Sequence, residues 1–577
     1  MSRTRKFKRD SKSVSLVMMG FMLMLLGTSL PAMATDATVD GFLENATFLR
    51  DGRGLSKFRN TAQLEFTKPI DNAGFWSTLS VNGVLRATYD GVYDLNDDEF
   101  GADAQEDYLG QNWHSRDDAT TGHPVLGGKP FLSAPVPFPC DNDPALCKNL
   151  EDYMDLDESE AKFPEFNDEM DFVRELYIDA TADLANGDQF SIRLGKQQVI
   201  WGRSDLFRVL DVINPVDYSR HNIYDELEDI RIPQWILKAE SRMGPTGVFD
   251  DFNTSVVWNF DKFRPSVLGQ AGQPYAILDA GGFFSSYLNI DAHPALGNGG
   301  VPGFYTAPVP IIHDVDLPNW SLDNTQVGLK WEGVYKDATF SLNGLYYRQQ
   351  LPSLHFRELV VAPGSGLPAT DGVFDIVFPR VKLIGGSIDY YSQAMDAVWR
   401  LESTFTAGEE LPRDTDGHKE TDIIRYVVGY DKNQLIPMLN AKRAFLISAQ
   451  VFGQHILDHE VDMPDYENNW IATLLFKGWW DSDRISPQLL MARDIRSKGM
   501  AVAPSVEWLV SDNLKVTLAA NIKSGGKKKF DWSVNDALTG VPGSLPNDYE
   551  PLARFTNGPM GVSNQEDELQ LTIRYSF

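Results

Sequence analysis

The sequence predicts an all-β protein, a transmembrane antiparallel β-barrel of about 16 to 18 strands with long loops on one side. Three observations lead to this prediction. The chain begins with a secretory signal, many later segments alternate apolar and polar residues, and no apolar run of transmembrane-helix length follows the signal. In an exported chain without such a run, residence in a membrane requires a closed barrel, which satisfies every backbone polar group.

The signal consists of a basic stretch, the apolar run VSLVMMGFMLMLLG and the small-residue site Pro31-Ala32-Met33-Ala34. This order is typical of a cleaved signal peptide, so we expect cleavage between Ala34 and Thr35. A membrane anchor is the alternative, but residues 14–30 are short for a transmembrane span. The signal contains six bases and one acid, which changes the net charge from −29 to −34 (−29 minus 5) after cleavage.

We expect residues 35–60 to form a short N-terminal segment near the barrel mouth and residues 61–577 to form the barrel. The alternation breaks in three long stretches, which predict loops at about residues 94–171, 261–320 and 351–380. Long loops belong on the outer side of such barrels, because periplasmic turns stay short. No linker or repeat divides the chain, so a single barrel accounts for its length.

The clearest hairpin lies between residues 172 and 197. Its first arm, FVRELYIDATADL, turns at Ala185-Asn186-Gly187-Asp188 and returns as FSIRLGKQ. Successive strand residues point to opposite faces, so this pattern gives one apolar and one charged face. Asn-Gly is a strong turn signal, because both residues tolerate a positive φ. In a barrel the apolar face would contact lipid and the charged face would line a watery interior.

The chain stops on ELQLTIRYSF, whose apolar residues fall on one face and whose polar residues fall on the other. This ending resembles the closing strand of Gram-negative outer-membrane proteins, which usually ends in Phe. The resemblance implies that Tyr575 and Phe577 form the terminal signal for the barrel assembly machinery. It also implies a location in the outer membrane of a Gram-negative cell, in contact with lipid and lipopolysaccharide.

The acidic composition excludes nucleic acid as a partner, because phosphates would be repelled. The runs DLNDDEFGAD and EDYMDLDESE contain enough carboxylates to bind Ca²⁺, but they lack the spacing of an EF-hand. We expect solvated acidic loops and no cofactor. The basic tip Lys527-Lys528-Lys529 would contact lipid or lipopolysaccharide phosphates.

The two cysteines, Cys140 and Cys147, lie in the loop sequence PFPCDNDPALCKN. In an exported chain a close pair of this kind predicts a disulfide. A metal site is the alternative, but no histidine lies nearby.

Residues 195–234 carry a sharper resemblance. The stretch Gly195 to Gly202 reads GKQQVIWG, Asn214-Pro215-x-Asp217 follows, and an acidic run ends in Arg231-x-Pro233. These motifs resemble the uncharacterised Gram-negative family called domain of unknown function 1302. The resemblance implies a large outer-membrane protein that works with a periplasmic partner and an inner-membrane RND-type transporter to move hydrophobic small molecules or lipids.

The segment from residue 201 to residue 231 interrupts two clear strands. Its apolar residues have near-helical spacing, and an acidic cluster follows them. Such a segment cannot lie in lipid, so it folds into the barrel as a constriction, outward as a lid, or onto the inner wall as a buttress. Its candidate lumen residues, in which the arginines would pair with the carboxylates, are Arg193, Trp201, Arg203, Arg208, Asp225, Glu226, Glu228 and Asp229.

The sequence contains few residue patterns that indicate catalysis. His455 and His459 lack a nearby third metal ligand, and only Ser219-Arg220-His221 hints at a hydrolase. We therefore predict a non-enzymatic, porin-like channel or transporter for hydrophobic or amphipathic small molecules or lipids. A barrel-borne lipase or hydrolase, and a structural or adhesive barrel, are the alternatives.

Overall fold

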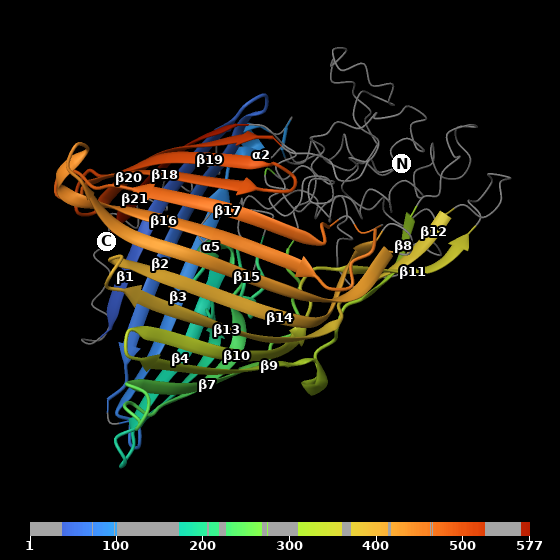
Figure 1. The fold of residues 1–577 in the computed structure, drawn as a ribbon, viewed down its shortest axis with the longest axis horizontal. Coiled ribbons are helices and arrows are strands. Elements are labelled where there is room, and N and C mark those ends of the chain that lie inside the picture. Colours follow the sequence, from blue (N-terminus) through green and yellow to red (C-terminus); the bar gives the residue numbers. More distant parts are fainter. Residues whose placement is uncertain are drawn as a thin grey trace, which may run out of the picture.

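A computed structural model of the chain shows a closed barrel of 18 antiparallel strands, as predicted (Figure 1). The structure describes residues 37–71, 73–96, 99–100, 172–204, 207–217, 227–267, 274, 310–360, 371–413, 417–461, 463, 465–525 and 567–577. Each barrel strand pairs with its neighbours along the chain, and pairing of the first strand with the last closes the sheet. Closure leaves no edge strand in the barrel.

The first half of the barrel contains β1 (Thr38–Arg50), β2 (Gly54–Pro69), β3 (Thr78–Asp90), β4 (Val173–Asp183), β5 (Gln189–Gln197), β6 (Gln234–Arg242), β7 (Asp251–Asn259), β9 (Gln326–Tyr335) and β10 (Ala338–Arg348). The second half contains β13 (Arg380–Ser392), β14 (Ala397–Arg413), β15 (Gly417–Ile436), β16 (Asn440–Ile456), β17 (Asn468–Lys477), β18 (Ile485–Asp494), β19 (Met500–Leu509), β20 (Leu514–Ser524) and β21 (Glu568–Ser576).

Side chains alternate between the two faces of this sheet. On β10, Leu342 and Tyr346 are exposed on the outside, whereas Asn343 and Leu345 are buried on the inside. The terminal strand follows the same rule, with every apolar residue of its outer face exposed: Leu569, Leu571, Ile573, Tyr575 and Phe577. An apolar exterior around a more polar interior is the arrangement of a barrel that contacts lipid.

The two ends of the barrel differ. At one end, here called the short-turn end, the connections are as short as residues 336–337 between β9 and β10. The opposite end, here called the long-loop end, has the connections 198–233 and 260–325. The described helices are only one turn long: α2 (Val92–Leu95), α5 (Leu227–Ile230) and the 3₁₀ helix η4 (Leu322–Asn324). None of the helices in the described ranges is long and apolar enough to cross a membrane.

Two boundaries differ from the prediction. Residues 35–60 are not a separate segment at the mouth, because β1 and the start of β2 lie there. The alternation of β1 was hidden because Ala46 and Phe48 are apolar yet face inward.

The loops predicted at 261–320 and 351–380 contain a second sheet, formed by β8 (Pro310–Asp316), β11 (Ser353–Val360) and β12 (Asp371–Val377). In it β12 pairs with β8 in parallel and with β11 antiparallel.

Candidate functional site

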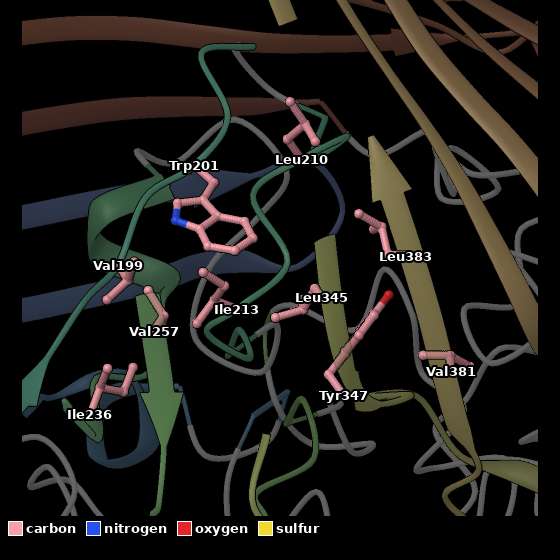
Figure 2. Close-up of a cluster of buried hydrophobic side chains, with 10 residues drawn as sticks. All are labelled: Val199, Trp201, Leu210, Ile213, Ile236, Val257, Leu345, Tyr347, Val381 and Leu383. Atoms are coloured by element: carbon pink, nitrogen blue, oxygen red, sulfur yellow. The ribbon is translucent and has the colours of Figure 1, made fainter. Parts of the chain in front are cut away.

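The connection from β5 to β6 enters the barrel interior from the long-loop end. Its residues Trp201, Leu210 and Ile213 are buried in an apolar cluster (Figure 2). The wall contributes residues from the inner faces of β6, β7, β10 and β13, namely Ile236, Val257, Leu345, Tyr347, Val381 and Leu383. Val199 completes the cluster. Through this cluster the described residues 199–213, here called the inner segment, pack against the inner faces of β6, β7, β10 and β13.

A second apolar cluster joins the inner segment to other strands of the wall. Val209 and Phe207 pack against the inner faces of β15 to β19 through Val427, Phe452, Ile471, Ala492 and Ala501. The rings of Phe207 and Phe452 meet edge to face, with their centroids 5.1 Å apart. The inner segment thus contacts strands from β6 to β19 and lies across the interior.

The second half of the connection, residues 227–233, contacts β3 and β4. Arg86 of β3 forms an ion pair of 2.8 Å with Asp229. The guanidinium of Arg174 on β4 donates to the backbone carbonyls of Glu228, Asp229 and Arg231. The connection is held to the wall through its backbone as well as its side chains.

Two glycines of the wall give the inner segment room. A Cβ atom on Gly328 of β9 would lie 2.5 Å from the Trp201 ring, and one on Gly385 of β13 would lie 2.8 Å from Leu210. Real Cβ atoms do not approach other heavy atoms so closely. These positions therefore admit the inner segment only because they lack a side chain.

Arg203 links the inner segment to carboxylates of three strands. Its guanidinium pairs with Glu332 of β9 at 2.8 Å and also with Asp389 of β13. The backbone N–H of Arg203 donates to Glu402 of β14. These bonds fix the position of the inner segment relative to the wall.

A buried network holds the two halves of the connection together. Asp211 and Arg231 form an ion pair of 2.6 Å, and both side chains are almost fully buried. Asn214, also buried, accepts from the N–H of Val199 and donates to the carbonyl of Ile232. Arg208 donates to the carbonyls of Asp211 and Asn214.

The expected pairing of the arginines with the acidic cluster differs from what these contacts show. Arg193 pairs with Asp179 on the neighbouring strand β4, Arg203 pairs with the wall, and Arg208 binds backbone carbonyls. Asp229 pairs with Arg86 instead. Asp225 and Glu226 lie outside the described residues. Asp211, Asn214 and Glu402 were not among the predicted site residues, and the only sequence signal for them was the Asn-Pro step.

Three cavities adjoin the connection. The first, of about 130 Å³, lies between β1, β2, β3 and residues 229–232. Six basic and three acidic side chains line it: Lys57, Arg59, Arg86, Arg174, Arg231 and Arg574, with Glu44, Asp217 and Asp229. The second, of about 180 Å³, combines Arg208, Arg425, Glu409 and Glu410 with apolar side chains that include Val209, Val212 and Leu383. The third, of about 250 Å³, lies between Trp201 and the charged residues of β6 and β9.

Several predicted sites lie outside the described residues, namely the cleavage site at Ala34 and Thr35, the cysteines Cys140 and Cys147, Ser219-Arg220-His221, the lysines 527–529 and the acidic runs in the first loop. At the other terminus, Phe577 exchanges two backbone hydrogen bonds of 3.0 Å with Gly41 of β1. His455 and His459 contact Asn468 and the carbonyl of Asp465, respectively.

Comparison with known proteins gives a family and distant structural similarity. The model of the family described as "Protein of unknown function (DUF1302)" matches residues 53–577. No curated protein matches the chain. OccAB3 of Acinetobacter baumannii is 8% identical with a TM-score of 0.39, covering 94% of this chain and 99% of that chain. An anion-selective porin from Comamonas acidovorans is 10% identical with a TM-score of 0.34, with coverage of 94% and 99%. Pseudomonas aeruginosa OccK8 (OprE) is 8% identical with a TM-score of 0.39, with coverage of 94% and 98%.

Proposed function

The chain belongs to the family described as protein of unknown function (DUF1302), and we propose that it is an outer-membrane channel for amphipathic small molecules with an apolar body and an anionic group. The barrel itself supports the membrane location. Its outer face exposes large apolar side chains on most strands, including Trp258, Ile384 and Leu518. Apolar surface of that extent is stable against lipid and would aggregate in water.

The observation that carries the proposal is the inner segment. An 18-stranded barrel without it would enclose a water-filled channel. Here Trp201 and Leu210 pack against the inner faces of β6 to β13, and Val209 packs against those of β15 to β19. The inner segment therefore narrows the open cross-section of the barrel. We infer that the inner segment is the constriction that selects the solute.

The lining of the interior supports the chemistry of the solute. The cavity beside β1 to β3 carries six basic and three acidic groups, a formal excess of three positive charges (6 minus 3), although the whole chain has a net charge of −29. The cavity beside Arg208 adds apolar side chains, and its two cations, Arg208 and Arg425, are balanced by Glu409 and Glu410. A carboxylate or phosphate group on the solute would complement the first cavity, and an apolar body would complement the second.

The orientation follows from the two ends of the barrel. Long loops face the outside of the cell in barrels of this type, so the short-turn end would face the periplasm. A periplasmic partner and an RND-type inner-membrane transporter, which the family resemblance implies, would then connect at the short-turn end. The resemblance alone supports these partners.

The test is conductance of the purified protein in planar bilayers. A variant lacking residues 204–222 should show a larger single-channel conductance than wild type and should admit bulky hydrophilic solutes. The control is Trp331→Ala on the outer face of β9, where Trp331 is 40% exposed, and this variant should leave conductance unchanged. Equal conductance of wild type and the 204–222 deletion, with both barrels folded, would contradict the role of the inner segment.

The solute class has a separate test. Dodecanoate and dodecyltrimethylammonium share a chain length but differ in the sign of the head group. Dodecanoate should block the open wild-type channel at lower concentration than the cation. Stronger block by the cation would contradict the anionic head group while leaving the channel function intact.

A further inference from the structure

Two histidines and a glutamate meet at the long-loop end, beside the second cavity described above. His355 comes from β11 of the second sheet, Glu410 from the upper end of β14, and His418 from the start of β15. One ligand atom from each lies within 4.8 Å of the other two. We propose that these three side chains bind a divalent transition-metal ion of the zinc class, which clamps the second sheet to the barrel wall.

The donor set fits such an ion. Zinc binds imidazole nitrogens and carboxylate oxygens at about 2.0–2.2 Å, and a set of two histidines and one glutamate leaves a position open for water or another ligand. Hard cations such as Ca²⁺ prefer oxygen ligands only, so two imidazoles disfavour them. The ion would replace the proton between His355 Nε2 and Glu410 Oε2, and these two atoms, now 2.7 Å apart, would have to separate by roughly half an ångström to take tetrahedral positions around it.

The imidazole of His418 is held in a form suited to metal binding. Its Nδ1 lies 2.9 Å from the carbonyl oxygen of Leu354. A carbonyl only accepts hydrogen bonds, so Nδ1 is the donor and Nε2 is the nitrogen that is left to face a metal ion. Metal-binding histidines commonly donate their second N–H to a carbonyl in this way. The rings of His355 and His418 are stacked, with their centroids 3.7 Å apart and their planes at 10° to each other, so one ring must rotate for both nitrogen lone pairs to point at the same ion.

The glutamate is also positioned before any metal binds. Gln349 accepts from the backbone N–H of Glu410 and donates to its backbone carbonyl, both at 2.9 Å. The Glu410 side chain is largely buried, whereas that of His355 is about one-third exposed, at 32%. A metal ion could therefore enter from the His355 side.

Among the described residues, no lysine or arginine forms an ion pair with the carboxylate of Glu410. Arg413 and Lys419, which follow Glu410 in the sequence, both pair with Glu460, at 2.9 and 2.7 Å. Arg425 pairs with Glu409 at 2.6 Å. In its described contacts the Glu410 carboxylate therefore faces His355, which is the second ligand that the proposed ion would share with it.

The consequence of binding would be mechanical. β11 belongs to the second sheet, whereas β14 and β15 belong to the barrel wall, so one ion would join the two. Glu410 also lines the cavity that contains Arg208 and Val209 of the inner segment. The metal would thus fix the second sheet beside the entrance to the interior. This inference does not depend on the channel function.

The test uses the full chain, purified in detergent without a polyhistidine tag, treated with a chelator and titrated with ZnCl₂ alone. Wild type should bind one equivalent, measured by calorimetry and by metal content after gel filtration. The variants His355→Gln, Glu410→Gln and His418→Gln should each lose roughly 100-fold or more in affinity. The control His459→Gln, which removes a histidine from the next loop, should bind as wild type does.

Cobalt provides a second readout on the unchanged protein. CoCl₂ should give visible absorption bands of a four- or five-coordinate ion with nitrogen ligands, and ZnCl₂ should abolish them. Failure of wild type to bind either metal stoichiometrically would overturn the proposal, whatever the variants do. Equal binding by wild type and the three folded variants would overturn it as well.

Discussion

Replacing Trp201 by Ala tests whether the inner segment closes the channel. Trp201 is 4% exposed and packs against the wall, and within the described residues its indole N–H makes no hydrogen bond. Its removal therefore costs packing alone. Truncation of a buried Trp to Ala costs about 3–5 kcal/mol. Because about 1.4 kcal/mol corresponds to a factor of ten, the ratio of docked to undocked inner segment should fall roughly 100-fold to a few thousand-fold.

The assay combines single-channel recording with hydrogen exchange. Trp201→Ala should spend a larger fraction of time in a high-conductance state, and the amides of residues 199–213 should exchange faster. The control is Trp331→Ala on β9, because Trp331 faces outward and is 40% exposed. Its effect should be confined to stability in the membrane. Unchanged conductance and unchanged exchange in a folded Trp201→Ala protein would refute the reasoning.

A double-mutant cycle sharpens the same test. The atom nearest to a Cβ on Gly328 belongs to the Trp201 ring, at 2.5 Å, and the next belongs to Leu345, at 2.9 Å, so Gly328→Ala should displace the inner segment in wild type. In the Trp201→Ala background only the contact with Leu345 remains, so the effect of the added methyl group should be smaller. Contacting residues show this kind of coupling, whereas independent sites have additive effects. Additive effects would place Trp201 away from Gly328.

Three further predictions concern stability, assembly and the loop cysteines. Asp211→Asn should destabilise the docked inner segment by about 3–5 kcal/mol, because it leaves the buried Arg231 without its ionic partner, and urea titration followed by Trp fluorescence measures this. The half-exposed pair of Arg193 and Asp179 provides the control, since Asp179→Asn should cost about 1 kcal/mol or less. Deleting Phe577 should impair assembly, because its backbone closes the sheet on Gly41, and loss of the heat-modifiable band on gels tests this. Normal insertion of the truncated chain would contradict it. Cys140 and Cys147 should resist thiol labelling until the protein is reduced, and labelling of both in the unreduced protein would contradict the disulfide.

Local patterns predicted the barrel because each strand carries its own signal. The alternation on β10 and β21 indicates which face contacts lipid without reference to any other strand. β1 was not predicted as a barrel strand because Phe48 is apolar on the inner face, where it packs with Ala46. The second sheet was not predicted because its parallel pairing joins β8 to β12, which are separated by more than fifty residues. No local pattern in the sequence indicates a pairing over that distance.

The site was predicted less completely because its contacts join residues that lie far apart in the sequence. The non-strand character of residues 201–231 indicated that this connection cannot lie in lipid, but three positions remained open. What placed the inner segment inside was packing against Leu345, Val427 and other residues far away in the chain. The partners of Arg203 are likewise Glu332 and Asp389, each more than a hundred residues distant. Sequence reasoning paired the arginines with the nearest acidic cluster because proximity along the chain was the only distance available.

The motifs that carry the family resemblance now have a physical explanation. Gly195 has φ of +145°, and a Cβ there would overlap the carbonyl of Leu176, so the end of β5 requires glycine. A Cβ on Gly202 would crowd Asp211 at 3.1 Å.

Asn214 joins the start of the connection to its end, and Arg231 neutralises the buried Asp211. Gly202, Asn214 and Arg231 serve the docking of the connection, whereas Gly195 serves the pairing of β5 with β4 in the wall. The 18 strands can form from alternation with many different side chains, whereas the docked connection needs these particular ones. It follows that most of the short motifs between Gly195 and Pro233 lie in the connection because a specific geometry, and with it the selectivity of the channel we propose, is specified there.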